Sequence, residues 1–187
     1  MLGDSFTLPG EDARTVDDVD NKMQAQLIIK DAPRMGLVTL TIGAESGLPG
    51  RYMAVIEGFS IGSPGDIDNI EARLGPLAKD TTMLVYMVGS SNSRLDPFMN
   101  IASNDPFAPG QVECDDAGRR GCADVPAFTD AGVELNDGAK VWGDQFDAGL
   151  RLAPGNPDPI PLEFRSKNDN TRGDYALVFI GELPPKQ

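Results

Sequence analysis

The stretch GDYALVFIGEL at residues 173–183 has a counterpart, GRYMAVIEGFS, at residues 50–60. Each begins with Gly-x-Tyr and continues as a run of branched apolar residues bounded by glycine, which is typical of a β-strand. Similar runs recur about every 10 to 15 residues without helical segments between them, so the pattern predicts an all-β, antiparallel, jelly-roll-like β-sandwich. The other predicted strands are 26–31, 37–44, 70–74, 81–89, 97–103, 139–144, 148–153 and 161–167.

Two segments depart from this rhythm. Residues 66–78, DIDNIEARLGPLA, could begin a helix, but Gly75-Pro76 would end it, and a strand at Ile70–Leu74 is preferred. Residues 104–136 are rich in Pro, Gly and Asp and contain both cysteines. A run of this length without strand signals is uncommon inside a compact domain. We therefore expect residues 104–136 to be a surface insertion.

The two cysteines, Cys114 and Cys122, lie in the sequence CDDAGRRGC. Their spacing excludes a CxxC redox site. We predict instead a local disulfide between them that closes an exposed loop. A disulfide in an acidic, turn-rich chain indicates an oxidising compartment, so we expect an extracytoplasmic location: periplasm, cell surface or secreted.

The composition excludes several classes of function. The chain has 187 residues, a net charge of −13 and no histidine. An acidic surface repels phosphate, which argues against nucleic acid as a partner. Without histidine there is no Ser-His-Asp or Cys-His machinery. Carboxylate pairs could serve a glycosidase, but they arise by chance among 29 acidic residues, and one tryptophan cannot line a sugar-binding cleft. We expect no enzyme activity.

The chain contains no apolar stretch of about 18 residues, so direct membrane insertion is not expected. Its first residues also lack the basic and apolar regions of a signal peptide. Export would then imply a removed segment before residue 1, or a longer parent protein.

Clustered oxygen ligands suggest at most one calcium ion as a cofactor, because calcium prefers six to eight carboxylate, amide or carbonyl oxygens. The candidate calcium ligands are Asp17, Asp18, Asp20 and Asn21, in the motif DDVDN of the first copy, with Asp144 and Asp147 at the matching place in the second. DDVDN lacks the glycine and distal glutamate of an EF-hand loop, and a solvated acidic turn is the alternative. Asp115, Asp116 and Asp124 are a third group, for which pairing with Arg119 and Arg120 is preferred.

The two copies of the opening phrase belong to a longer series of matches. In both parts of the chain an Asp-rich turn precedes an apolar strand that is followed by Ala-Pro, at Ala32-Pro33 and Ala153-Pro154. Tyr52 and Tyr175 then open the last strand of each series. Chance similarity between short strands is the alternative to a true repeat.

The sequence SRLDPFMNI at 93–101 resembles the Leu-Asp-Pro strand of the bacterial pre-peptidase C-terminal (PPC) domain. Residues 136–154 and 172–183 are similar to later parts of that family. The resemblance covers 61–187, with 104–136 as an insertion, and 1–60 resemble only the C-terminal half of such a domain. Gly143-Asp144 replaces the family's paired Asp. Leu95, Asp96, Pro97, Tyr52 and Tyr175 carry the resemblance and are expected to have structural roles.

The resemblance implies a small noncatalytic β-sandwich appended to a secreted bacterial protein, often a protease. Some relatives bind calcium or an extracellular polymer such as collagen. Residues 1–60 would then be a half-sandwich whose open edges need covering, either within the chain or by strand addition from another chain. Alternatively, they are the N-terminal strands of one larger sandwich.

Some aromatic and methionine side chains are candidates either for ligand contacts or for the core. Trp142, Phe146 and Tyr175 could form a ligand platform, although burial in the core is preferred, and the two tyrosines would also anchor a hydroxyl at the rim. Met83 and Met87 are expected to fill the core.

The expected function is a noncatalytic, extracytoplasmic module for protein–protein interaction or self-assembly. One alternative is a calcium-dependent module that binds an extracellular protein or polysaccharide. A second alternative is a structural subunit of a filament or of a membrane-anchored complex.

Overall fold

The computed structural model of the chain describes residues 14–17, 25–28, 50–63, 65–72, 82–102, 113–119, 122, 124–131, 135–136, 141–153, 160–168 and 171–183. The strand predicted at 37–44 lies outside these residues. The chain divides into two compact units, Met1–Gly50 with Leu183–Gln187, and Arg51–Glu182. In the first unit, β1 (Arg14–Asp17) pairs antiparallel with β2 (Ala25–Ile28).

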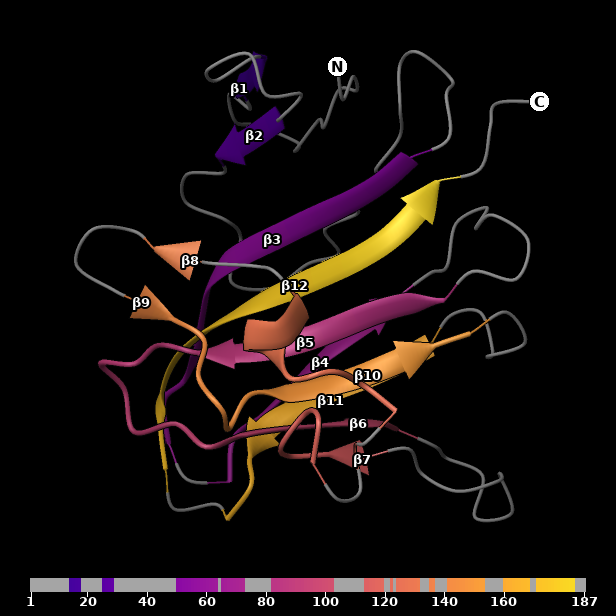
Figure 1. The fold of residues 1–187 in the computed structure, drawn as a ribbon. Helices are drawn as coiled ribbons and strands as arrows, with labels where there is room; N and C mark the ends of the chain where they lie inside the picture. The colour runs from indigo at the N-terminus through magenta and orange to yellow at the C-terminus, as the bar shows by residue number, and fades with distance from the viewer. Residues whose placement is uncertain are drawn as a thin grey trace. The chain divides into compact units, whose positions relative to one another are not determined.

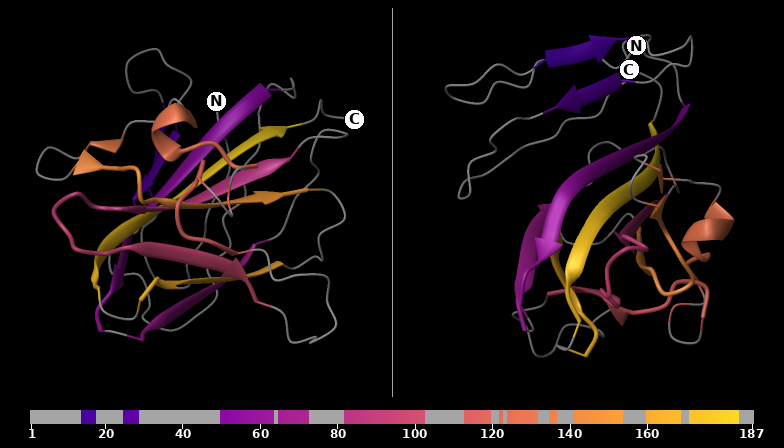
Figure 2. Two further views of the ribbon diagram at one scale, coloured as in Figure 1. Left: turned by 60° about the horizontal axis from the view of Figure 1, so that its bottom comes forward. Right: turned by 90° about the vertical axis from the view of Figure 1, so that its left-hand side faces the viewer.

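The second unit is a β-sandwich of two four-stranded antiparallel sheets (Figures 1 and 2), which confirms the predicted fold class. The first sheet has the order β10–β5–β12–β3 and the second has the order β4–β11–β6–β7. The strands of the first sheet are β10 (Ala148–Leu152), β5 (Met83–Gly89), β12 (Gly173–Leu183) and β3 (Gly50–Ile61). Those of the second are β4 (Ile67–Ala72), β11 (Ile160–Ser166), β6 (Pro97–Ile101) and β7 (Glu113–Cys114).

The core lies between the two sheets and follows the alternation of the strands. In β11, Ile160, Leu162 and Phe164 are fully buried, whereas the residues between them are half-buried. The strand β5 differs, because both of its faces are buried except at Leu84. This explains why its sequence, MLVYMVG, is an almost continuous apolar run, and it places Met83 and Met87 in the core as predicted.

The outer face of β5 is covered by the segment that follows the disulfide. The 3₁₀ helix η1 (Phe128–Ala131) brings the Phe128 ring 5.4 Å from the ring of Tyr86, edge to face. The Tyr86 hydroxyl donates a 3.0 Å hydrogen bond to the carbonyl of Pro126. Cys114, Cys122 and Val125 are also buried. The expectation of an exposed loop is therefore wrong for these residues, and the side chains of Val125 and Phe128 form a third layer on the first sheet.

A short hairpin completes the described part of this region. It pairs β8 (Leu135–Asn136) with β9 (Val141–Trp142), where a single strand at 139–144 was predicted. Elsewhere β4 begins at Ile67, three residues earlier than the predicted strand at 70–74. No helix among the described residues is long and apolar enough to cross a membrane.

The two similar phrases of the sequence lie side by side, because β3 and β12 are neighbours in the first sheet (Figure 1). Both read Gly-x-Tyr followed, six residues after the tyrosine, by glycine. Tyr52 of β3 lies over Gly181 of β12, where an added Cβ would stand 2.6 Å from the tyrosine hydroxyl. At the other end of the pair, Tyr175 of β12 stacks on Phe59 of β3 at 5.2 Å.

These contacts require a β-bulge in β3, that is, one residue more in β3 than in the matching stretch of β12. Gly181 and Tyr175 are six positions apart and face the same side of β12, whereas their partners Tyr52 and Phe59 are seven positions apart. An odd separation reverses the face in a regular strand. Gly58, with φ of +100°, supplies the irregular residue that restores the inward direction of Phe59.

Candidate functional site

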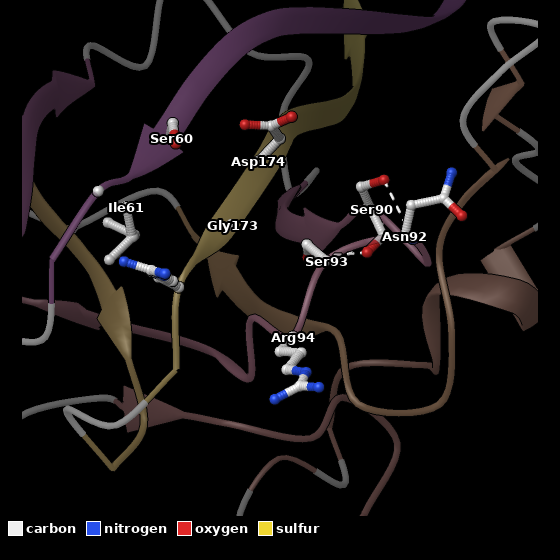
Figure 3. A pocket seen from close by; sticks show the side chains of 10 residues that line it. Ser60, Ile61, Ser90, Asn92, Ser93, Arg94, Gly173 and Asp174 are labelled. Carbon is white, nitrogen blue, oxygen red and sulfur yellow. Dashed lines mark hydrogen bonds between the residues drawn. The ribbon is translucent and has the colours of Figure 1, made fainter.

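A polar pocket of about 480 Å³ lies at one end of the sandwich. Three segments that are distant in the sequence line it: residues 60–62 at the end of β3, residues of the 90–94 turn between β5 and β6, and residues 172–174 at the start of β12. Figure 3 shows Ser60 and Asp174 together on neighbouring strands, with the turn of Ser90, Asn92 and Ser93 opposite them.

Hydrogen bonds fix the turn that forms one wall of the pocket. The backbone N–H of Ser90 donates to the carbonyl of Asp174 at 3.0 Å, which joins the turn to β12. The hydroxyl of Ser93 donates to the Ser90 carbonyl at 2.8 Å and accepts from the N–H of Leu95 at 3.3 Å. The turn therefore has a fixed shape rather than that of a free loop.

Glycine at position 173 allows this close approach. A Cβ on Gly173 would overlap the Ser93 side chain, coming within 2.6 Å of its Oγ. Any other residue would push the turn away from β12 and open the pocket wall.

Two guanidinium groups border the pocket, those of Arg94 and Arg172, and both side chains are exposed. Neither has a hydrogen bond or an ion pair to any residue of the described part of the chain. Arg51 on β3 likewise has no such bond within the described part of the chain. By contrast, Arg119, Arg151 and Lys167 all bond to oxygen atoms of other residues.

The Leu95-Asp96-Pro97 motif follows the pocket turn and enters β6. The N–H of Asp96 donates to Thr171 Oγ1 at 3.0 Å, and its carbonyl accepts from the N–H of Lys167 at 2.9 Å. Leu95 packs against the core and Pro97 is buried. Burial raises the pKa of Asp96, and the positive charge of Lys167 opposes that rise. The motif thus ties β6 to both ends of the connection between β11 and β12.

The hydroxyl groups of Tyr175 and Tyr52 each form a hydrogen bond to a side chain of another strand. Tyr175 is fully buried, and its hydroxyl donates a 2.7 Å hydrogen bond to Oδ2 of Asp68 on the opposite sheet. Burial is the main cause that raises the pKa of Tyr175. The hydroxyl of Tyr52 donates to Sδ of Met83 at 3.4 Å.

Asp147 and Asp144, the candidate calcium ligands of the second copy, bind backbone groups. Asp147 is buried, with Oδ1 accepting from the N–H of Gly89 at 3.0 Å and Oδ2 from the N–H of Asp144 at 2.6 Å. Oδ1 of Asp144 accepts from the N–H of Phe146 at 2.7 Å. Burial raises the pKa of Asp147 to about 7. This geometry makes Asp147 a link between the turn before β10 and the end of β5.

The candidate ligands of the first copy lie at the end of β1 and beyond it. Asp17 is the last residue of β1, and Asp18, Asp20 and Asn21 lie outside the described residues. Within the described part of the chain no three acidic or cysteine side chains form a group that could hold a metal ion.

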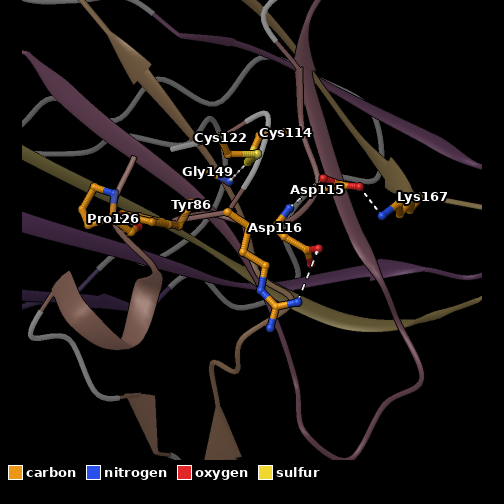
Figure 4. Close-up of a disulfide and its surroundings, with 9 residues drawn as sticks. Tyr86, Cys114, Asp115, Asp116, Cys122, Pro126, Gly149 and Lys167 are labelled. Carbon is orange, nitrogen blue, oxygen red and sulfur yellow. Dashed lines mark hydrogen bonds and ion pairs between the residues drawn. A yellow bond between two sulfur atoms is a disulfide. The ribbon is translucent and has the colours of Figure 1, made fainter. Parts of the chain in front are cut away.

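The predicted disulfide between Cys114 and Cys122 is present (Figure 4). It ties the edge of the second sheet to the first sheet, since Sγ of Cys114 accepts from the N–H of Gly149 on β10 at 3.3 Å. The acidic residues of its loop have cationic partners: Asp115 pairs with Lys167, which lowers the pKa of Asp115, and Asp116 lies 4.0 Å from Arg119.

The three aromatic residues considered as a ligand platform are not exposed together. Trp142 and Tyr175 are buried in the core, whereas Phe146 is 43% exposed, with the Arg119 guanidinium 5.4 Å from its ring centre. The residues that line the pocket were not predicted from the sequence. The run SSNSR at 90–94 was a signal, because hydroxyl, amide and guanidinium groups follow one another directly after an apolar strand.

Comparison with known proteins gives no match: no family description, no curated protein and no solved structure corresponds to this chain.

Proposed function

We propose that the chain is a noncatalytic assembly module of an exported protein, and that it associates with a second copy of itself through β3. The observation that carries the proposal is the position of β3 as the last strand of the first sheet, with 12 residues and no further strand paired to it among those described. A long strand at a sheet edge presents unpaired N–H and C=O groups that can pair with another chain.

The opposite edge of the same sheet is already covered. On β10, the N–H of Gly149 donates to Sγ of Cys114, and the carbonyl of Asp147 just before the strand accepts from the N–H of Ala117 at 2.8 Å. The disulfide segment thus occupies the β10 edge. This asymmetry favours β3 as the associating edge.

The exposed side chains of β3 are complementary to themselves. Arg51, Met53 and Glu57 are exposed, and Met53 is 49% exposed. An antiparallel pair of two β3 strands, centred on Ala54, would set Arg51 opposite Glu57 and Met53 opposite Val55 on the same face. Opposite charges and apolar pairs directly across two strands stabilise a sheet. A two-fold axis would make the arrangement closed, so each dimer would have one continuous sheet of eight strands.

Two further features agree with this proposal. The irregular residue Gly58 ends the regular part of β3, which confines pairing to the stretch before it. The disulfide is consistent with an oxidising, extracytoplasmic environment, where the resemblance to PPC domains would also place a noncatalytic sandwich. Among the described residues, calcium-dependent binding has no comparable geometric support.

The test is the mass of the protein in solution, measured by light scattering after size exclusion at several concentrations. We expect the wild type to reach about twice the 19.9 kDa of one chain. Glu57→Arg would place two arginine pairs across the axis and should return the mass to that of one chain. Combining it with Arg51→Glu restores opposite charges and should restore the dimer.

Glu113→Arg is the matched control, because Glu113 is also exposed but lies on β7 of the other sheet. It makes the same change in charge and should leave the dimer intact. A wild-type protein that stays at one chain mass at all concentrations would refute the proposal. So would a Glu57→Arg dimer as strong as that of the wild type.

A further inference from the structure

We infer that the pocket formed by residues 60–62, 90–94 and 172–174 binds a sugar acid, meaning a carboxylate flanked by hydroxyl groups, as in a uronic acid residue of a glycan. The inference does not depend on the proposed dimer, because the lining segments do not include the residues 51–57 that would pair. A pocket of about 480 Å³ is within the size range of small-molecule sites.

The carboxylate specificity is assigned to Arg94 and Arg172. Guanidinium groups bind planar carboxylates through two parallel hydrogen bonds, and these two have no partner among the described residues. They come from different segments, one after the β5–β6 turn and the other before β12, and both line this pocket. Binding should weaken as salt is added, since both guanidinium groups are exposed.

The rest of the lining favours hydroxyl groups beside that carboxylate. Ser60 and Asn92 are exposed hydroxyl and amide groups, and Asp174 adds a carboxylate on the wall opposite the turn (Figure 3). A carboxylate accepts hydrogen bonds from sugar hydroxyls, which inorganic sulfate lacks. The combination therefore favours a carboxylate that carries neighbouring hydroxyl groups.

The wall is preorganised for binding. Ser90 is buried, its N–H is bonded to the Asp174 carbonyl, and Gly173 lets Ser93 pack directly against β12. A ligand would not have to order this turn, which reduces the entropic cost of binding.

The experiment is a titration of the full chain at low salt, followed by calorimetry or by changes in amide NMR signals. The probes are galacturonate, neutral galactose and inorganic sulfate, with oligogalacturonate to distinguish a free sugar acid from a glycan. We expect saturable binding of galacturonate, no binding of galactose, and weaker binding of sulfate, which has no hydroxyl groups for the rest of the lining to bond. Tighter binding of the oligomer would identify a glycan as the source of the ligand, and equal binding would identify the free acid.

The variants are Arg94→Gln and Arg172→Gln, each expected to weaken galacturonate binding about tenfold or more, because a charge-assisted hydrogen bond is lost. Arg119→Gln removes the same charge outside the pocket and should bind as the wild type does. Arg94→Lys keeps the positive charge but loses the two parallel N–H donors of the guanidinium group, so it should also bind galacturonate more weakly. Failure of galacturonate to bind, equal binding of galactose or sulfate, or unchanged binding by both glutamine variants overturns the inference.

Discussion

The hydroxyl of Tyr175 on β12 donates a hydrogen bond of 2.7 Å to Asp68 on β4 and so joins the two sheets through the core. The ring of Tyr175 is stacked between those of Phe59 and Phe164, whose centres lie 5.2 Å and 6.2 Å away. A single side chain therefore contacts both layers of the sandwich and orders the strands around it.

Tyr175→Phe should destabilise the fold by about 1 to 2 kcal/mol, because the ring remains but the buried hydrogen bond to Asp68 is lost. Urea denaturation measures the change in the free energy of unfolding. Tyr52→Phe is the control, since it removes only a weaker contact with the sulfur of Met83. Equal losses of unfolding free energy in the two variants would show that the hydrogen bond between Tyr175 and Asp68 contributes no more to stability than the contact of Tyr52 with Met83.

Gly181→Ala should destabilise the sandwich by about 1 to 3 kcal/mol, because the added methyl group would press against the ring of Tyr52. In a Tyr52→Ala background the same substitution should have little effect, since the ring is absent. Gly62→Ala is the control, because its nearest contact, at 3.6 Å, is of ordinary length. Thermal melts of the wild type and these variants would contradict the prediction if the loss at Gly181 persisted without Tyr52.

Reduction of the disulfide should lower the free energy of unfolding by about 2 to 3 kcal/mol, the value expected for closing a loop of this length. Melting curves with and without reductant measure the loss. The double variant Cys114→Ala/Cys122→Ala should be insensitive to reductant and should melt with the reduced wild type. An oxidised protein that melts no higher than this variant would be inconsistent with the buried position of the bridge.

Asp147 should make the protein less stable as the pH rises. Its pKa is raised from 3.8 to about 7 by burial, so between these values the folded state holds a proton that the unfolded state has lost. At about 1.4 kcal/mol per pKa unit, this amounts to roughly 4 kcal/mol, lost as the pH rises from about 4 to 7 and constant above that.

The Asp147→Asn variant isolates this contribution, because it cannot titrate. The free energies of unfolding of the wild type and the variant are compared from about pH 4 to pH 8, the range in which the group titrates. Their difference should shift in favour of the variant as the pH increases. A difference that is flat, or that favours the wild type at higher pH, would mean that the hydrogen bonds from Gly89 and Asp144 outweigh burial.

The strands could be predicted because their alternation is a local property of the sequence. Residues 160–166 show which side chains enter the core without any knowledge of their neighbours. The apolar run at 173–183 predicts a strand but not its inner face, because the four residues from Tyr175 to Val178 are all buried. The burial of Val125 and Phe128 could not be predicted, because they lie among Pro, Gly and Asp and are covered only once η1 packs on Tyr86. The pocket was missed for a similar reason: its three segments meet only in the folded sheet, and a sequence gives no distance between Arg94 and Arg172.

The contact between Tyr52 and Gly181 has a consequence for how the unit can be connected to other proteins. The two residues lie next to the ends of the compact unit Arg51–Glu182, so the polypeptide enters and leaves that unit at one place. A domain with adjacent ends can be inserted into a surface loop of a host protein, or can have its ends joined and be reopened elsewhere, without a long linker. Residues 51–182 are thus suited to insertion as a unit into another protein.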